Sequence, residues 1–250
     1  NYMSVRKEKI LVFAAHTADP FLAAGGTLAK HVQRGDDVIL VCLSYGERSH
    51  AFTIWEKKTK GEAIPPLDEI KEIKRREMEK AAEVIGAEVR FLDFGECPLI
   101  IDKEKLSTLV DVVREIKPTI VLTHWIRDWM NPDHEIAGNY TLQACYYSMW
   151  MGFETRNPPY RIENIYHYAI NPMSLAPEIG FTPDFYVNIE DTIDLKIKAL
   201  LEFKTQKYNS LNIEEYVKSF AYTTGFRVNI KYAEAFKRIW SPPQPHDFLK

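Results

Sequence analysis

The sequence predicts an α/β fold built on a Rossmann-like, mostly parallel sheet with helices on both faces. Two observations carry this prediction. Short apolar, β-prone runs recur along the first half of the chain, and each is followed by a stretch with helical spacing of apolar residues. Strands that alternate with helices in this way are typical of βαβ units, whose strands lie parallel. The four predicted strands are residues 10–15, 38–43, 89–94 and 119–124.

The first βαβ unit occupies the N-terminal 43 residues. The run ILVFAA predicts a buried strand, and Leu28 and Val32 have helical spacing in a segment that stops at Gly35. We expect the pair Gly25-Gly26 at the strand-to-helix turn, where glycine lets the backbone approach a neighbour closely. The pair matches neither GxGxxG nor a P-loop, so a nucleotide-binding fingerprint is absent.

The later elements follow from the same signals. A charged amphipathic helix at 67–86 ends in glycine, and a helix at 103–118 is stopped by Pro118. A further helix is expected after residue 134, short strands and loops over 155–190, helical structure over 191–208 and an irregular tail from 241 to 248. We interpret residues 1–250 as a single domain, with a core at 9–145 that holds the site and a C-terminal part at 146–250.

Composition and charge exclude several classes of partner. Apolar residues make up 46% of the 250 residues and the net charge is −3, so neither a nucleic acid nor an anionic membrane is expected. No apolar run reaches the roughly 18 residues of a membrane-spanning helix, and the N-terminus lacks the apolar centre of a signal peptide. Three widely spaced cysteines argue against a disulfide framework, which favours a cytoplasmic location.

Polar residues gather directly after each predicted strand. The motifs are AHTAD, SYGER, DFGE and THWIRDWMNPDH. Ligands of open parallel sheets bind at the carboxyl ends of the strands, so these motifs predict a functional site at that edge.

Histidines and a carboxylate in these motifs suggest a metal. His16, Asp19 and His134 could meet across neighbouring loops, and two imidazoles with one carboxylate are typical of a catalytic zinc site with an open position. The alternative is that His16 merely ends a strand and His134 merely starts a helix.

Several motifs together resemble the LmbE/PIG-L family of zinc-dependent N-acetylglucosamine-type deacetylases. The resemblance rests on His16-Thr17-Ala18-Asp19, Gly25-Gly26-Thr27 and Asp133-His134. It implies one zinc ion per chain, held by His16, Asp19 and His134. The family's first motif is usually His-Pro-Asp-Asp, and its first aspartate is the base that activates water. That position is Ala18 here, so the deacetylase's base is missing.

The departures match one branch of the family. The stretches AHTAD, LSYGER and NPDH, with Tyr232-Ala233-Glu234, resemble the 4-oxalomesaconate hydratases. These enzymes hydrate a carbon–carbon double bond in aromatic acid catabolism. The resemblance therefore implies a zinc-dependent hydratase acting on a small anionic, unsaturated oxo or enol polycarboxylate.

The remaining polar residues are candidates for proton transfer and substrate binding. Glu47 is the expected acid/base, with Asp133 and His124 as further catalytic or orienting groups. The structural alternatives are a salt bridge of Glu47 to an arginine and helix ion pairs for Arg75. Candidates to bind the substrate, three of them arginines that suit carboxylates, are Arg48, Arg75, Arg127 and Asn131.

Other functions stay open at this point. Glu47 or Asp133 could replace the missing base of a zinc-dependent deacetylase, or the chain could be an inactive binding protein that keeps the fold. Residues 48–66 suggest a mobile flap over the site, and the aromatic cluster 146–153 makes a homo-oligomer plausible.

Overall fold

One mixed sheet contains all the strands of the described residues. The computed structural model describes residues 6–170, 179–208 and 210–240. The strands are β1 (Lys9–Ala14), β2 (Asp37–Cys42), β3 (Glu88–Phe91), β4 (Ile120–His124), β5 (Asn164–Tyr168), β6 (Phe185–Asn188) and β7 (Ala233–Trp240). Their order in the sheet is β3-β2-β1-β4-β5-β7-β6. The first five strands are mutually parallel, whereas β7 runs antiparallel to both β5 and β6.

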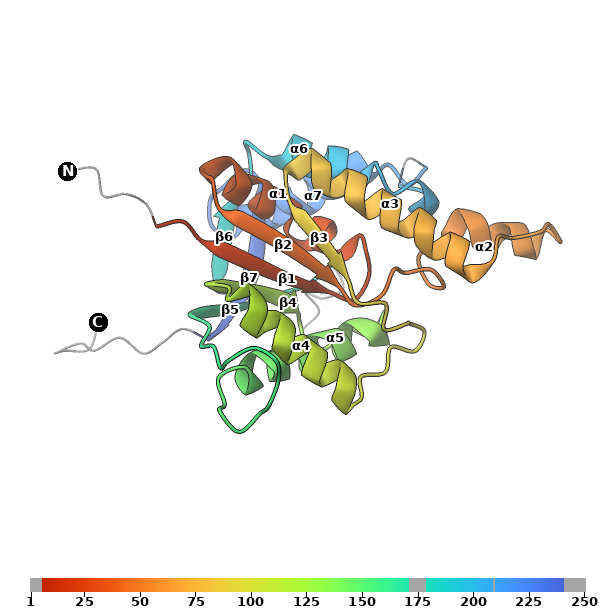
Figure 1. Cartoon of the computed structure of the whole chain (residues 1–250). Coiled ribbons are helices and arrows are strands. Elements are labelled where there is room, and N and C mark those ends of the chain that lie inside the picture. Colours follow the sequence, from red (N-terminus) through yellow and green to blue (C-terminus); the bar gives the residue numbers. More distant parts are fainter. Residues whose placement is uncertain (1–5, 171–178, 209, 241–250) are drawn as a thin grey trace.

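Helices cover both faces of this sheet. They are α1 (Asp19–Arg34), α2 (Phe52–Thr59), α3 (Leu67–Ile85), α4 (Lys103–Ile116), α5 (Pro132–Tyr147), α6 (Ile193–Leu200), the 3-10 helix η2 (Lys204–Gln206) and α7 (Ile213–Phe226). Figure 1 shows α1, α3, α6 and α7 on one face and α4 and α5 on the other. The predicted fold class is confirmed.

The alternation of side chains along β1 explains why both faces need cover. Ile10 and Val12 belong to the core under α1, α3 and α6, whereas Leu11 and Phe13 belong to the core under α4 and α5. All four side chains are at most 1% exposed. A strand buried on both faces is a continuous apolar run, which is the pattern that predicted it.

All four predicted strands are present; the ends of three lie within one residue of the prediction, and the fourth ends earlier. The strand expected at 89–94 is β3, which ends at Phe91. Beyond it Asp93 and Gly95 have positive φ values of 51° and 78°, which are incompatible with an extended strand. The chain therefore turns away two residues after β3, and DFGE forms a loop.

The glycine pair lies inside α1, not at the turn before it. This corrects the prediction, because α1 already begins at Asp19 with Pro20 in its first turn. A Cβ atom on Gly26 would come within 2.8 Å of the Cβ of Ile189, and one on Gly25 within 3.1 Å of Lys196 Cγ. The two glycines therefore allow α1 to pack closely against the chain around α6.

The C-terminal part contains two elements that the sequence analysis did not predict, α7 and β7. Helix α7 begins at Ile213 and is capped by Asn212, whose side chain accepts the N–H of Glu215 at 3.4 Å. Ile213, Val217 and Ala221 are spaced four residues apart and are buried, so a helical signal was present. The expected short strands at 155–190 include β5 and β6, whereas the tail at 241–248 lies outside the described residues.

A buried ion pair ties this C-terminal part to α1. Glu234 of β7 accepts the N–H groups of Gly26 at 3.0 Å and Thr27 at 2.7 Å. Lys196 of α6 donates to Glu234 at 2.7 Å and to the carbonyl of Leu22 at 2.7 Å. In a regular helix the N–H of Gly26 and the carbonyl of Leu22 would bond to each other. The pair therefore binds both ends of one backbone hydrogen bond of α1.

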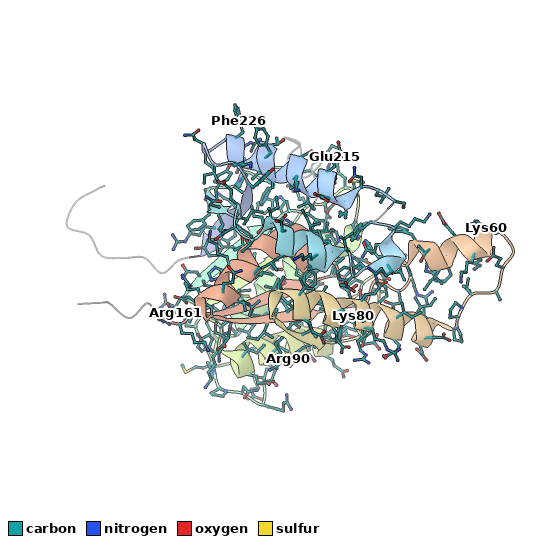
Figure 2. The ribbon with its side chains drawn as sticks, turned by 90° about the horizontal axis from the view of Figure 1, so that it is seen from above. Lys60, Lys80, Arg90, Arg161, Glu215 and Phe226 are labelled. Atoms are coloured by element: carbon teal, nitrogen blue, oxygen red, sulfur yellow. The ribbon has the colours of Figure 1, made fainter. Side chains whose placement is uncertain are left out.

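The segment predicted to be a flap, residues 48–66, contains α2. Figure 2 shows Lys60, at the end of α2, far out beyond the body of the sheet. The indole N–H of Trp55 in α2 donates to the carbonyl of Glu47 at 2.8 Å, which connects the helix to the loop after β2. The mobility of this segment stays a prediction.

None of the helices in the described part of the chain combines the length and the apolar character needed to cross a bilayer.

Candidate metal centre

The polar motifs after the strands meet at the carboxyl edge of the sheet. His16 follows β1, Asp19 begins α1, and His134 lies in the first turn of α5. Helix α5 begins sharply there, because the Asn131 side chain caps it by accepting the N–H of Asp133 at 3.1 Å, and Pro132 follows in its first turn. Two strand-to-helix connections thus deliver the predicted ligands: β1 to α1 supplies His16 and Asp19, and β4 to α5 supplies His134.

His16, Asp19 and His134 are brought together around one carboxylate oxygen. Asp19 Oδ2 lies 3.3 Å from His16 Nδ1 and 3.5 Å from His134 Nε2. All three residues are at most 4% exposed. The backbone N–H of His16 donates to the same Oδ2 at 2.7 Å, which fixes the Asp19 side chain.

The donor atoms of this cluster suit a metal ion. His16 Nδ1 and His134 Nε2 are buried and have no hydrogen-bond partner. His134 Nδ1 lies 2.8 Å from Asp128 Oδ2, so a proton held between them leaves Nε2 as the free donor. One donor atom from each of the three residues falls within 4.8 Å of the others. Two imidazoles and one carboxylate in this arrangement form a group able to hold a metal ion.

The charges of the cluster support one another. Burial opposes ionisation of Asp19, but His134 and His16 lower its pKa well below the usual value, so it is ionised. Asp19 is therefore a full anionic donor between two imidazoles.

His124 lies beside the cluster. Its Nε2 accepts the N–H of Ala15 at 3.0 Å and is 3.3 Å from Asp19 Oδ2. Its ring stacks on His134 with centroids 4.4 Å apart. Burial and the neighbouring His134 lower the pKa of His124 to about 4, so it is a neutral imidazole at pH 7.

Asp133 is close to the cluster, but both of its oxygens are occupied. Oδ1 accepts the N–H of Leu99 at 2.8 Å, and Oδ2 accepts that of Cys97 at 2.9 Å and lies 3.6 Å from His16 Nε2. Although burial opposes ionisation, these contacts lower the pKa of Asp133 to about 2. Its carboxylate holds the loop after β3 and lies near a ring nitrogen of His16.

Glu47 is a buried carboxylate with an unused oxygen. The residue is 1% exposed, and Oε2 has no hydrogen-bond partner. Burial, aided by the charge of Glu96, raises the pKa of Glu47.

The loop that carries Glu47 packs directly on the metal cluster. Gly46 has φ +76°, and a Cβ atom there would lie 3.1 Å from His50 Cβ and 3.4 Å from His16 Cβ. Glycine is required at this position both for the left-handed backbone and for the close approach.

The candidate substrate-binding residues have different surroundings. Arg75 is engaged on α3 by Glu72 at 2.7 Å and also by Glu79, which is the helix ion-pair alternative. Asn131 caps α5. Arg127 is exposed and lines a small pocket together with His124, Asp128, His134 and Tyr168. Arg48 is exposed, and its backbone N–H donates to Glu96.

Two residues at the cluster had no predicted role, Glu96 and His50. Glu96 Oε2 lies 3.0 Å from His16 Nε2, and the rings of His50 and His16 have centroids 4.3 Å apart. The position of Glu96 in the loop after β3 was a usable signal. His50 lies in the segment interpreted as a flap, and only the fold places it against His16.

Comparison with known proteins agrees with this geometry. Residues 11–145 match the family model "PIG-L: GlcNAc-PI de-N-acetylase". The chain is 30% identical to the 4-oxalmesaconate hydratase of Pseudomonas putida, over 95% of this chain and 92% of that protein. It is 27% identical to the diacetylchitobiose deacetylase of Thermococcus kodakarensis, over 93% of this chain and 83% of the relative.

A solved structure shows the same fold. The crystal structure of GalB, the 4-carboxy-2-hydroxymuconate hydratase of Pseudomonas putida KT2440, matches with a TM-score of 0.82 and 27% identity. The match covers 97% of this chain and all of GalB. These relatives are enzymes, and both a hydratase and a deacetylase share the fold. With its candidate metal-ligand cluster at the carboxyl edge of the sheet, this chain belongs to the PIG-L family.

Proposed function

We propose that this protein is a zinc-dependent hydratase of the hydro-lyase class. It adds water to a C=C bond of an unsaturated oxo or enol polycarboxylate such as 4-oxalomesaconate, in aromatic acid catabolism. The similarity to the Pseudomonas putida hydratase over nearly the whole chain supports this substrate class.

The observation that carries the proposal is Ala18. It lies between the metal-ligand candidates His16 and Asp19, where the deacetylases that the chain resembles have their base. Ala18 is 1% exposed and its methyl group cannot accept a proton. Of the two carboxylates considered as substitute bases, Glu47 and Asp133, the latter has both oxygens occupied by backbone N–H groups. An amide hydrolase would therefore lack the group that activates water at its usual place.

His16, Asp19 and His134 would hold the zinc ion. When bound, zinc would supply Lewis acidity, polarising a substrate oxygen conjugated with the double bond. The protein's own groups then have to bind the carboxylates and move one proton.

Glu47 is the group that moves the proton in this proposal. Hydration adds the hydroxyl group of water to one alkene carbon and a proton to the other. A single residue can therefore accept a proton from water and deliver a proton to the second carbon. Glu47 has an unpartnered oxygen and a pKa raised by burial, which brings its two protonation states closer in energy near neutral pH. His124 and Asp133 orient the cluster.

Arg127 and Arg48 are the proposed contacts for the substrate carboxylates. Arg127 lines the pocket beside His134, and Arg48 follows Glu47 directly. A guanidinium group matches a carboxylate with two parallel hydrogen bonds. Asn131 and Arg75 have the structural partners described above, so they are less suited to this task.

Two assays on zinc-loaded protein test the function. The first follows the loss of ultraviolet absorbance of a conjugated oxo-dienoic polycarboxylate, and the second follows free amine released from an N-acetyl amino sugar. We expect turnover in the first assay and none in the second. Amine release without hydration would establish the deacetylase alternative, and absence of both would favour a binding protein.

The variant Ala18→Asp tests whether the chain is a deacetylase that has only lost its base. General base catalysis contributes about 10²–10⁴-fold, so restoring the aspartate in such an enzyme would raise amidase activity by that factor. We expect no gain, because the proposed substrate is not an amide. The control is zinc content, which has to match that of the wild type. A large gain in amine release would overturn the hydratase proposal.

The variant Glu47→Gln tests the proton carrier. It keeps the size of the side chain but replaces the titratable carboxyl group with an amide, so kcat should fall by about 10²-fold or more. Zinc content and KM should stay near those of the wild type. Arg75→Gln, which removes only helix ion pairs, is the matched control and should keep kcat. A Glu47→Gln enzyme with full turnover would rule out this mechanism.

Location and assembly complete the proposal. All three cysteines are free, which agrees with a cytoplasmic protein. Exposed apolar side chains near the site and after α5 favour a homo-oligomer, whose surface would cover Trp129, Met130, Trp150 and Met151. Light scattering of the purified chain measures its mass.

A further inference from the structure

Glu96 is a buried carboxylate that joins two parts of the site. It lies in the loop after β3, and its side chain has no exposed surface. Oε1 accepts the backbone N–H groups of Arg48 at 2.5 Å and Ser49 at 3.1 Å. Oε2 accepts the hydroxyl of Ser49 and lies 3.0 Å from His16 Nε2. One end of this carboxylate thus holds the loop after Glu47, and the other faces a metal-ligand candidate.

The burial of the Glu96 carboxylate bears on which ring nitrogen of His16 carries a proton. A buried anion needs donors around it, and no lysine or arginine forms an ion pair with Glu96 within the described residues. Nε2 of His16 makes no aligned hydrogen bond in this structure, but it lies 3.0 Å from Oε2 and is the ring nitrogen that can carry a proton toward Glu96. When His16 binds a metal its ring has to be neutral, and the lone pair is then on Nδ1, the nitrogen that faces Asp19 at 3.3 Å.

The same logic applies to the other imidazole. Asp128 lies 2.8 Å from His134 Nδ1, and the other ring nitrogen of His134, Nε2, faces Asp19. Each of the two histidines is thus oriented by its own carboxylate, and the two free nitrogens converge on one oxygen. The hydrogen bonds of the Asp128 carboxylate go to its own loop and to His134, whereas Glu96 binds the loop of Glu47 through two N–H groups and a hydroxyl.

We propose that Glu96 is a positioning residue that fixes the Nε2-protonated tautomer of His16 and, through Arg48 and Ser49, the position of the loop that carries Glu47. It thereby fixes the position of the candidate metal ligand, His16, relative to the proton carrier, Glu47. The second half of this inference rests on the proposed function, whereas the first half concerns the metal site alone.

Glu96→Gln separates the two tasks of the carboxylate. A glutamine oxygen can accept either the two backbone N–H groups or the His16 proton, but its amide nitrogen cannot replace the other oxygen as an acceptor. We expect zinc affinity, measured by competition with a chromophoric chelator, to fall by about 10–100-fold, the usual cost of losing a group that orients a ligand. Ser49→Ala, which leaves the His16 contact intact, should keep the zinc affinity of the wild type.

Asp133→Asn provides the internal comparison, because Asp133 lies farther from His16 Nε2, at 3.6 Å. It should weaken zinc binding less than Glu96→Gln. Equal zinc affinity in Glu96→Gln and the wild type, or a larger loss in Asp133→Asn, would overturn the assignment.

Two measurements do not depend on enzyme activity. In the zinc-loaded wild-type chain, long-range ¹H–¹⁵N NMR should show His16 with a protonated Nε2 and no proton on Nδ1. Finding the opposite tautomer would refute the proposal even if Glu96→Gln does not fold. Hydrogen exchange should show the Arg48 and Ser49 amides opening about tenfold faster in Glu96→Gln. Unchanged exchange would refute the link to the loop.

Activity then tests the coupling. At saturating zinc, Glu96→Gln should still have a lower kcat than the wild type, because the loop of Glu47 is loosened, with a smaller effect on KM. If the wild type hydrates no substrate, the proposed function fails, while the zinc, NMR and exchange results still decide the role of Glu96.

Discussion

His134→Ala is expected to abolish metal binding and hydration together. The substitution removes one of the three candidate ligands. Asp19 Oδ2 then keeps His16 as its partner in the cluster, with the neutral imidazole of His124 beside it. Two remaining ligands do not make a stable zinc site, for which three protein donors are the usual minimum. Elemental analysis of chain purified without chelator should show about one zinc per wild-type chain and almost none in the variant.

The control for this experiment is another histidine. His31 of α1 pairs with Asp36 at 2.7 Å, so His31→Ala should keep both metal and turnover. The zinc affinity of Asp128→Asn should lie between those of His134→Ala and His31→Ala, because losing the group that orients His134 costs about 10–100-fold in metal affinity. Full zinc content in His134→Ala would show that a different set of residues holds the metal, with His16, His50 and Glu96 as the next group to examine.

Glu234→Ala is expected to be the most destabilising of these substitutions. The Glu234 carboxylate and the Lys196 ammonium are 4% and 5% exposed, and alanine would leave the ammonium buried with only the Leu22 carbonyl as partner. The N–H groups of Gly26 and Thr27 would also lose their acceptor. Removing one partner of a buried ion pair typically costs about 3–5 kcal/mol, and we expect the free energy of unfolding to fall by that amount.

Denaturant unfolding of the full chain measures this loss. The surface pair Lys218–Glu214 on α7, 2.6 Å apart and half exposed, is the matched control, and Glu214→Ala should change stability by less than about 0.5 kcal/mol. If Glu234→Ala costs less than about 1 kcal/mol, the buried pair does not anchor α1 as described.

Much of the site followed from where polar residues stand relative to apolar runs. His16 comes directly after β1 and His134 begins α5 after β4, and β1 and β4 are neighbours in the sheet. Parallel neighbours deliver their carboxyl ends to one edge, so residues 118 positions apart in sequence could be expected to meet. Their roles as metal ligands stay a prediction.

The partners of each side chain could not be predicted in this way. Arg75 and Arg127 are both arginines that could bind a substrate carboxylate, yet Arg75 pairs with carboxylates on its own helix, whereas Arg127 lines the pocket. Asp133 and Glu47 are both acids in these motifs. Backbone N–H groups of a distant loop occupy the carboxylate of Asp133, whereas one oxygen of Glu47 has no partner. Such differences depend on contacts between segments far apart in the chain.

The sequence by itself determined the sheet of alternating strands and helices, the edge at which its polar residues collect and the family motif that lacks a base at Ala18. These features are local: apolar periodicity, capping residues and residue types next to strand ends. Only the tertiary structure decided that Gly26 packs against Ile189, that Glu234 and Lys196 bind the backbone of α1, and that Glu96 faces His16. The physical reason is that a buried polar or small residue is defined by its partner, and the partner comes from an element more than 70 residues away in each of these cases.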